Sequence, residues 1–595
     1  FIAASTISLL VIALLVFALV MIIIRLNKHR SKSPYRIYHS RMLPGGKMLK
    51  VLDRDVLAYL NVQYGRVTKR FQRADLVKLS ENTAAPKATN GRPRSTSCAQ
   101  VHYSPFPSYP FPNSIDLEDC LFVNIWAPAD ENNDAFRPVV VVLAGGNFNA
   151  GGCGDYELYD GSIMAALWNQ VVVIPNYRVG LFGFLNELAL NESENVGITD
   201  QDLLFRWVQS YIHLFGGSAK QVILLGHEAG ATMAGHHILS SQRTELFKRS
   251  ILISGAPCRV LPTDAETKIS SLSRNLLCTN ERQTGGEDVV GCLRKKSAES
   301  IVFNQQTPTL GGALAAFAPT FNGRLTPRSL ILSPKQDDLF RNRKEILIGY
   351  TEDEGSAYTS ALLVHYGMQH VSDLDINTGV LILNLYLRLH GAASYDNIVN
   401  HYMKQAGRRP MKSLQKAIGD FVVHCPMNIF AKRYASSGND VYMYHFKHVP
   451  PYRWWPLWMG SPQMLDWLYI SGNILKLNKQ KVEVKDSDVK LSQKMASLLA
   501  CFAETGNPEK CPTSPSINWK KLTEEQQFHL QVVNATTVIV QNGLPFDKEC
   551  KMWEEVLTGR PTKDLVTDHS DNKLNLASLL NGTDIQLRLA KPPGA

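Results

Sequence analysis

The longest apolar run in the chain lies at its N-terminal end. Residues 1–24 carry no charged side chain and are mostly Leu, Ile, Val, Ala and Phe. A helix of this length rises about 1.5 Å per residue, roughly 36 Å in all, which is enough to cross a bilayer. We therefore predict a transmembrane helix over residues 1–24. A buried core helix is the alternative, and a cleaved signal peptide fits less well because no small-residue cleavage site follows the run.

Shorter apolar runs recur through the centre of the chain. Runs this short and continuous are typical of strands that a parallel sheet buries on both faces. Between two of them, apolar residues from Leu203 to Phe215 follow a period of 3.6, with Asp200 as the expected N-cap and Gly216 after the last turn. This alternation predicts an α/β fold, a mostly parallel central sheet flanked by helices. Its strands are expected at 139–143, 171–174, 222–225, 251–253 and 346–348.

These patterns divide the chain into four parts. Residues 25–46 are predicted to be a basic juxtamembrane linker, residues 47–559 a single α/β domain, and residues 560–595 a polar flexible tail. The chain length alone favours several domains, but large α/β folds often form one unit.

Charge changes this picture only near the predicted membrane helix. The 595 residues are 45% hydrophobic and 19% charged, as is ordinary for a globular protein, and the net charge is +10. Eight basic residues and no acidic residue lie between Arg25 and Lys50. The excess charge therefore belongs largely to the linker. No basic module interleaved with aromatic residues indicates nucleic acid, and no residue pattern indicates a metal ion or another cofactor.

One strand leads into a motif that carries chemistry in many α/β enzymes. The run 222–225 is followed by Gly226-His227-Glu228-Ala229-Gly230 and then by a helical pattern. This is the layout of the nucleophile elbow, in which a sharp turn exposes the middle residue at the top of the sheet. That residue is usually Ser, but here it is Glu228.

With this elbow, three other segments resemble the cholinesterase and type-B carboxylesterase family. Residues 118–126 read EDCLFVNIW, similar to the family's EDCLxLNIW. Residues 176–184 and 195–201 read NYRVGLFGF and NVGITDQ, similar to its YRVGxFGF and GNxGLxDQ segments. The similarity extends over about residues 45–560 and implies an α/β-hydrolase fold. A shared fold does not by itself imply a shared activity.

The resemblance assigns three residues to the family's catalytic triad. Glu228 takes the place of the serine, and Glu354 that of the acid. The catalytic His should follow residues 455–460, WPLWMG, but its position holds Gln463. A Gln amide does not titrate and cannot transfer a proton, and losing Ser or His alone costs serine proteases roughly a millionfold in turnover. We therefore interpret the triad as degenerate, with no catalytic set intact.

The surroundings of the triad also depart from the family. Gly145, Gly146 and Asn147 correspond to its oxyanion loop, but the Asn147 side chain is expected to crowd an acyl group. The loop of residues 99–117, where the family has the Trp of its choline site, contains no Trp. A relocated catalytic base remains an alternative among the nearby histidines, which are His227, His236 and His237.

Ten cysteines and three glycosylation sequons bear on the compartment. The resemblance implies the disulfides Cys98–Cys120, Cys278–Cys292 and Cys425–Cys550, which persist in oxidising compartments. Of the four other cysteines, Cys153, Cys258, Cys501 and Cys511, the last two could pair or stay buried thiols. Sequons for N-glycans begin at Asn191, Asn534 and Asn581.

The orientation evidence conflicts. The basic linker favours the cytoplasm by the positive-inside rule, whereas the disulfides and sequons favour the outside of the cell. We expect a single-pass type II protein of the plasma membrane with an extracellular C-terminal domain. Because the chain begins with Phe, a cytoplasmic segment is expected before it.

A degenerate triad on a retained fold predicts binding rather than catalysis. The chain is most similar to the neurotactin-type, catalytically inactive branch of the family, which implies heterophilic adhesion or receptor-type binding of a cell-surface or secreted protein. One alternative is a hydrolase with Glu228 as a non-standard nucleophile, and another is a noncatalytic binder of small ligands. Homodimerisation through the segment 550–557 is a further expectation.

Overall fold

The described part of the chain comprises most of residues 45–558. The structure is a computed structural model. The transmembrane prediction, most of the predicted linker, the tail, and the sequons at Asn191 and Asn581 lie outside the described residues. None of the described helices is long and apolar enough to span a membrane. Within 45–558 the residues not described are 80–95, 102–114, 130–134, 154–156, 186–194, 241–243, 262–264, 280–288, 306–309, 311–312, 321–339, 341–343, 367, 369–373, 391–395, 405–408 and 481–482.

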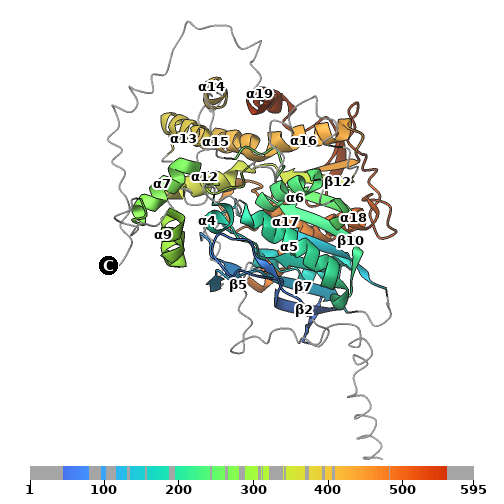
Figure 1. Cartoon of the computed structure of the whole chain (residues 1–595). Coiled ribbons are helices and arrows are strands. Elements are labelled where there is room, and N and C mark those ends of the chain that lie inside the picture. Colours follow the sequence, from blue (N-terminus) through green and yellow to red (C-terminus); the bar gives the residue numbers. More distant parts are fainter. Residues whose placement is uncertain are drawn as a thin grey trace, which may run out of the picture.

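A mixed sheet forms the centre of the molecule (Figure 1). Its seven strands from β9 to β14 in the sheet order pair in parallel, and the pairs at both ends are antiparallel. The order of the eleven strands among the described residues is β1 (Lys47–Val51), β2 (Arg54–Gln63), β7 (Phe122–Pro128), β9 (Val171–Pro175), β8 (Arg137–Leu143), β10 (Gly217–His227), β11 (Arg249–Ile253), β12 (Ile346–Thr351), β13 (Val441–Phe446), β14 (Phe528–Val532) and β15 (Val538–Asn542).

The apolar runs form strands because both faces of the sheet are covered. In β8, Val139, Val141 and Leu143 belong to one hydrophobic core, and Val140 and Val142 belong to another. Successive side chains of a strand point to opposite faces, so a sheet buried on both sides selects an unbroken apolar run. The sheet and its predicted strands agree with an α/β-hydrolase fold.

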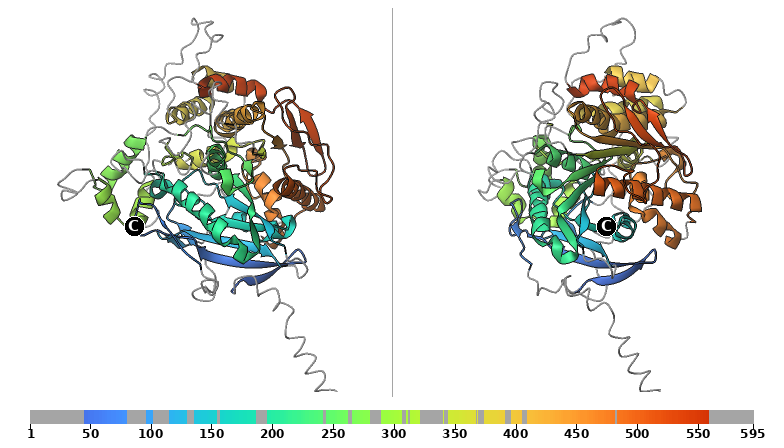
Figure 2. Two further views of the ribbon diagram at one scale, coloured as in Figure 1. Left: turned by 45° about the vertical axis from the view of Figure 1, so that its right-hand side comes forward. Right: turned by 90° about the vertical axis from the view of Figure 1, so that its right-hand side faces the viewer.

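Helices cover both faces (Figure 2). One face packs against α5 (Val196–Tyr211), α6 (Ala229–Leu239) and α16 (Cys425–Ser436), and the other against α3 (Ser162–Trp168), α17 (Leu465–Ser471) and α18 (Asp486–Thr505). The other helices are α4 (Gly180–Phe184), α7 (Ala265–Asn275), α9 (Val289–Lys295), α10 (Ala298–Gln305), α12 (Gly355–His365), α13 (Ile376–Arg388), α14 (Asp396–Lys404), α15 (Pro410–Gly419) and α19 (Asp547–Thr558).

The predicted cap of the helix after β9 is wrong. Helix α5 begins at Val196, one turn earlier than expected, after Asn195 in a left-handed conformation with φ of 56°. Asp200 lies inside the helix and is fully buried, where its carboxylate binds the Arg178 guanidinium at 2.6 Å. A buried cation needs such a partner, and Asp200 serves as that partner instead of capping the helix. Gly216 ends the segment as predicted, with φ of 77°.

Four disulfides join distant or adjacent segments. The three predicted pairs, Cys98–Cys120, Cys278–Cys292 and Cys425–Cys550, are present, and the last ties α19 to α16 across 125 residues. Cys501 pairs with Cys511, the pairing that sequence left open. Cys153 and Cys258 are buried as thiols.

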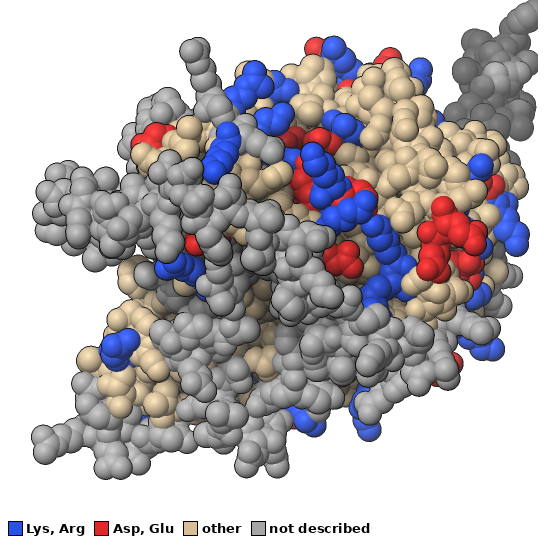
Figure 3. Space-filling model, turned by 90° about the horizontal axis from the view of Figure 1, so that it is seen from above, with Lys and Arg blue, Asp and Glu red and all other residues tan. Residues whose placement is uncertain are grey.

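The face seen from above, over α14 and α19, mixes both signs of charge. Basic and acidic side chains lie beside one another there (Figure 3). Lys416 of α15 and Lys432 of α16 form ion pairs with Glu549 and Asp547 of α19 at 3.1 and 2.6 Å. These pairs dock α19 on its neighbours.

Candidate functional site

The elbow predicted from sequence has the backbone geometry of a nucleophile elbow. Strand β10 ends at His227, Glu228 follows with φ of 55° and ψ of −112°, and α6 begins at Ala229. This conformation is rare for a residue with a side chain, and it persists only where the surroundings enforce it. A Cβ atom on Gly226 would lie 2.3 Å from the carbonyl oxygen of Gly230, so the turn requires glycine at this position.

The Glu228 carboxylate occupies the oxyanion loop. Its Oε2 accepts hydrogen bonds from the backbone N–H groups of Gly146 at 2.9 Å and Asn147 at 2.6 Å. In an esterase, such N–H groups stabilise the negative oxygen that develops in the transition state. Here a permanent negative charge of the protein itself fills that place.

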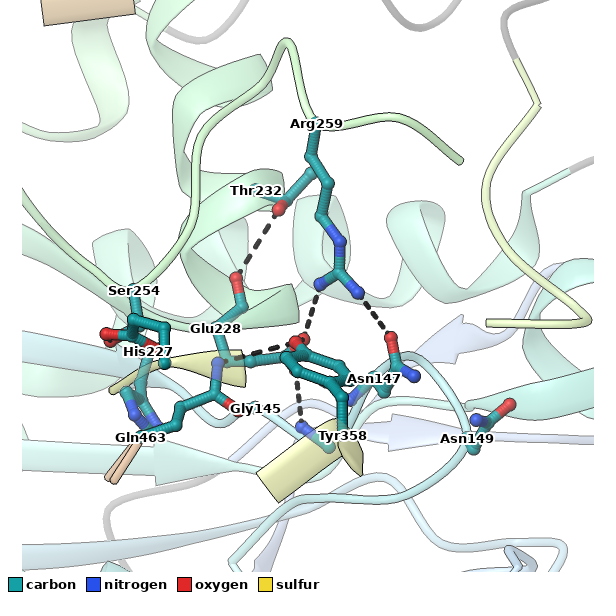
Figure 4. Close-up of polar contacts among 12 residues, drawn as sticks. Gly145, Asn147, Asn149, His227, Glu228, Thr232, Ser254, Arg259, Tyr358 and Gln463 are labelled. Atoms are coloured by element: carbon teal, nitrogen blue, oxygen red, sulfur yellow. Dashed lines mark hydrogen bonds and ion pairs between the residues drawn. The ribbon is translucent and has the colours of Figure 1, made fainter. Parts of the chain in front are cut away.

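A buried arginine neutralises this charge. The Arg259 guanidinium forms an ion pair with Oε1 of Glu228, and it also donates to the side-chain oxygen of Asn147 at 2.5 Å (Figure 4). The Tyr358 hydroxyl donates to the same Oε1 at 2.8 Å. The Arg259 guanidinium carbon lies 5.9 Å from the Phe148 ring centre and 5.7 Å from that of Tyr358. The two oxygens of Glu228 thus accept four hydrogen bonds from three separate segments.

These contacts fix the charge state of Glu228. Burial alone would raise its pKa, but Arg259 and the N–H groups of Gly146 and Asn147 outweigh burial and hold the pKa at about 2. Burial opposes the charge of Arg259 as well, yet Tyr358 and Glu228 raise its pKa above the usual value. At neutral pH both groups are charged. The Asn147 side chain, which was expected to crowd an acyl group, accepts a hydrogen bond from Arg259 and is not part of the pocket lining.

Glu354, the residue predicted at the acid position, forms its hydrogen bonds with segments other than the elbow. Glu354 is fully buried, and its Oε1 accepts hydrogen bonds from the Ser254 hydroxyl at 2.7 Å and the Thr351 N–H at 2.8 Å. Its Oε2 has no hydrogen-bond partner among the described residues. Burial raises the pKa of Glu354. Glu354 therefore accepts hydrogen bonds from Ser254 and Thr351 and none from the elbow.

Gln463 is linked to the elbow indirectly, through the hydroxyl group of Tyr358. Its Nε2 donates to the Tyr358 hydroxyl at 3.3 Å, and that hydroxyl in turn donates to Glu228. A shared pocket brings these residues together, with a cavity of about 30 Å³, enough for two or three water-sized groups at the roughly 10–15 Å³ that each needs. The pocket is lined by Gly145, Gly146, Ala150, Gly151, Tyr159, His227, Glu228, Ala313, Ala357, Tyr358, Ala361, Gln463 and Met464.

Of the three histidines near the elbow, His227 lines the pocket. Its Nδ1 lies 2.7 Å from the Tyr159 hydroxyl, and burial lowers its pKa to about 4. His237 is fully buried on α6, where its Nε2 lies 2.7 Å from the side-chain oxygen of Gln201. His236 is buried on the same helix. No group of side chains that could hold a metal ion occurs in the part of the chain that the structure describes.

Sequence reasoning missed Arg259, Tyr358 and Tyr159. Arg259 follows the end of β11 by six residues, and Tyr358 lies in the first turn of α12. One signal could have found Arg259: a carboxylate predicted at a buried elbow needs a cation, and the loop after the adjacent strand can supply one. No sequence pattern indicated the two tyrosines.

The fold and the elbow define the class of protein. The profile of the Carboxylesterase family matches residues 45–553, and the chain belongs to that family.

Two acetylcholinesterases are among its similar relatives. The acetylcholinesterase of Bungarus fasciatus is 30% identical over 536 residues, which cover 86% of this chain and 84% of the relative. That of Danio rerio is 29% identical over 602 residues, which cover 89% and 88%.

Proposed function

We propose that this chain is a noncatalytic, cholinesterase-like membrane protein that binds a cell-surface or secreted protein. One observation carries the noncatalytic part: the Glu228 carboxylate accepts hydrogen bonds from Gly146 and Asn147, the N–H groups that an ester carbonyl would need. An acyl substrate would have to displace a charged group that is held by four hydrogen bonds.

The proton chemistry supports the same conclusion. Ester hydrolysis requires a nucleophile with a base that takes up and returns its proton. The elbow presents Glu228 with a pKa of about 2, and the base position presents the amide of Gln463. His227 is buried and neutral, with its Nδ1 beside Tyr159. The pocket therefore lacks a serine–imidazole pair among the described residues.

The adhesion part of the proposal rests on the predicted membrane helix and on the disulfides, which indicate an oxidising compartment. Residues 1–24 are long and apolar enough to span a bilayer, and four disulfides favour an oxidising compartment. We propose a type II orientation at the plasma membrane, with the C-terminal domain outside the cell. Such a domain is available to bind a partner on another cell.

A turnover assay tests the noncatalytic part. The full-length protein in lipid nanodiscs is incubated with short-chain aryl and choline esters, beside the variant Glu228→Ser/Gln463→His. We expect background rates for the native chain. Multiple turnovers by the native chain that Glu228→Gln abolishes would refute the proposal. Thermal unfolding of each variant controls for loss of the fold.

A binding screen tests the adhesion part. Cells that display the full-length chain are probed with an array of tagged extracellular domains. The control is a matched chain in which the exposed pair Lys521–Asp440 is removed, a change that should leave the fold intact. We expect saturable binding of at least one extracellular protein, and its absence across a comprehensive array would count against adhesion.

A hydrolase that uses Glu228 as its nucleophile is the alternative in a different class. Some α/β-hydrolases attack halides or epoxides with an elbow carboxylate. Against this, both oxygens of Glu228 already accept two hydrogen bonds each, and the second step needs a base to activate water. A panel of halides and epoxides, assayed with Glu228→Gln as control, decides between the two.

A further inference from the structure

We propose that two segments of the domain, residues 66–73 and 291–296, together form a binding surface for a sulfated polysaccharide of the cell surface. Neither segment contains Asp or Glu, while the first carries four Lys or Arg residues and the second carries three. The choice of this partner rests on the proposed placement of the domain outside the cell. The surface adds a second binding activity to the protein binding proposed above.

Hydrogen bonds join the two segments. The Arg70 guanidinium donates to the carbonyl oxygens of Leu293 and Lys296, at 2.6 Å in each case. In the other direction, Nε of Arg294 donates to the carbonyl oxygen of Arg70 at 3.4 Å. Segments that lie 223 residues apart in the chain at this contact are therefore neighbours, and α9, which ends in the second segment, lies on the outside of the domain (Figure 1).

Both segments are fixed to the core. Phe71 is 1% exposed, and the carbonyl oxygen of Gln72 accepts a hydrogen bond from the buried Arg178 guanidinium at 2.6 Å. The second segment is held by the disulfide Cys278–Cys292. A surface whose charges are already in place loses less conformational freedom when it binds an extended ligand. The two basic segments therefore form one preorganised surface.

These basic residues are more than the end of α9 needs. Lys and Arg often occur at a helix C-terminus because they bind its last carbonyl groups and offset its dipole. At α9 the side chain of Arg70, which is 10% exposed, already binds two of these carbonyl groups. The Arg294 side chain donates to the Arg70 carbonyl instead of to its own helix. The charges of Arg294 and Lys296 are therefore available to a ligand.

Carboxylates next to the first segment neutralise its other cations. Glu118 accepts a hydrogen bond from Nε of Arg70 at 2.7 Å. Asp75 lies opposite Arg66, where β3 (Gly65–Arg66) pairs with β4 (Asp75–Leu76). A further carboxylate, that of Asp119, accepts a backbone N–H of the segment at 2.9 Å. Arg66 and Arg70 are therefore left out of the proposed ligand contacts.

Four cations of the surface remain. Lys69 and Arg73 are exposed, and Arg294 and Lys296 are half-buried. None of the four forms an ion pair with a residue that the structure describes. They come from a turn and from a helix end on the outside of the domain. Charges spread in this way fit an extended polyanion better than a small anion, which needs donors that converge on one point.

A sulfated polysaccharide has the matching chemistry. Its sulfate groups are permanently charged and closely spaced, and Lys and Arg bind such groups through charge-assisted hydrogen bonds. A nucleic acid is also a polyanion, but the only aromatic residue in the sequence of the two segments, Phe71, is buried and cannot stack on a base. Anionic lipids belong to the cytoplasmic leaflet, on the other side of the membrane in the proposed orientation.

Immobilised heparin is the probe for this surface. The full-length protein in nanodiscs of zwitterionic lipid is compared by biolayer interferometry with the surface variant, Lys69→Gln/Arg73→Gln/Arg294→Gln/Lys296→Gln. We expect the surface variant to bind at least about tenfold more weakly, because four charge contacts are lost. For the native chain, raising the salt concentration from about 0.05 M to about 0.2 M should weaken binding roughly a hundredfold. The binding of the surface variant should depend on salt less steeply.

The matched control loses the same charge elsewhere, at exposed lysines outside the two segments, and should bind heparin as the native chain does. Its substitutions are Lys220→Gln, Lys490→Gln, Lys510→Gln and Lys548→Gln. Both variants keep the basic linker of residues 25–46, so its contribution is the same in each. Thermal unfolding checks the fold. If the surface variant fails to fold, Lys69→Gln/Arg73→Gln against Lys220→Gln/Lys490→Gln still decides.

Two results overturn the inference without touching the proposed function. One is equal heparin binding by the surface variant and the matched control, which assigns the attraction to the linker or to net charge. The other is tighter binding of single-stranded DNA, or of phosphatidylserine vesicles, than of heparin by the native chain. Failure of an antibody to reach the domain on intact cells would instead contradict the extracellular placement, so the two failures are distinguishable.

Discussion

The carboxylate of Glu228 and the guanidinium of Arg259 form an ion pair in the interior, with side chains 5% and 2% exposed. The partners come from the elbow after β10 and from the loop after β11. A buried pair of this kind contributes little net stability, but removal of one partner leaves an uncompensated charge. The pair therefore constrains which substitutions the site tolerates.

Removing one partner should destabilise the fold strongly. We expect Glu228→Ala to lower the free energy of unfolding by about 3–5 kcal/mol, because Arg259 stays buried without its counter-ion. Glu228→Ala/Arg259→Met should recover most of the loss. Urea unfolding of both variants measures the coupling. Lys432→Ala, which breaks a half-exposed pair with Asp547, is the control and should cost below about 1 kcal/mol.

Removal of the Glu228 side chain should also create a site for small carboxylates. In Glu228→Ala the N–H groups of Gly146 and Asn147 and the guanidinium of Arg259 still converge on one place. Formate should bind there and raise the melting temperature of the variant. At a formate concentration a hundredfold above its Kd, the free energy of unfolding should increase by about 3 kcal/mol. The native chain, and the variant in sodium chloride of equal ionic strength, should show no such rise. An equal response of the native chain would contradict this prediction.

The His227 ring should make stability depend on pH. Burial lowers the pKa of His227 from 6.5 to about 4, so the unfolded chain binds a proton at higher pH than the folded chain does. The neutral His227 ring contributes up to about 3 kcal/mol to the free energy of unfolding. This contribution is fully present above pH 6.5 and is lost as the pH falls to about 4. We expect His227→Phe to lose stability less steeply than the native chain over this range. Parallel pH profiles from chemical unfolding would show that His227 does not titrate as described.

The exposed sequon at Asn534 gives a test of the compartment. Asn534 lies in the turn between β14 and β15, where its side chain accepts hydrogen bonds from the N–H groups of Thr536 and Thr537. An extracellular domain should carry a glycan there. When the full chain is expressed in animal cells, Asn534→Gln should increase its electrophoretic mobility by the amount that one glycan accounts for. That difference should disappear after endoglycosidase treatment. Gln541→Asn, on the neighbouring β15 but outside any sequon, is the matched control and should leave the mobility unchanged.

The sequence predicted most of the architecture because local patterns encode it. The apolar runs of β8, β9 and β10 lie as expected, since burial on both sheet faces requires them. The strand, the two glycines and the helical pattern around Glu228 identified the elbow, and the family resemblance identified the partners of Cys425 and Cys278. The strands and the elbow depend on short segments whose form varies little with the rest of the chain.

The neighbours of Glu228 could not be predicted in the same way. Arg259 and Tyr358 are 31 and 130 residues away from it along the chain. Their contact depends on how the segments that follow β10, β11 and β12 meet at one edge of the sheet, and no periodicity in the sequence encodes that meeting. Asp200 illustrates the same limit, because its buried contact with Arg178 overrode a local capping preference.

The first described strand has a mechanical consequence for an anchored domain. β1 lies at the edge of the sheet and pairs with β2 in an antiparallel ladder from Lys47, opposite Ala58, to Val51, opposite Arg54. In the membrane-anchored protein that we propose, tension would act first on Lys47. It would break the backbone hydrogen bonds between β1 and β2 one after another before it reached the parallel strands. The β1–β2 pair would therefore separate first under tension, while the rest of the sheet keeps its structure.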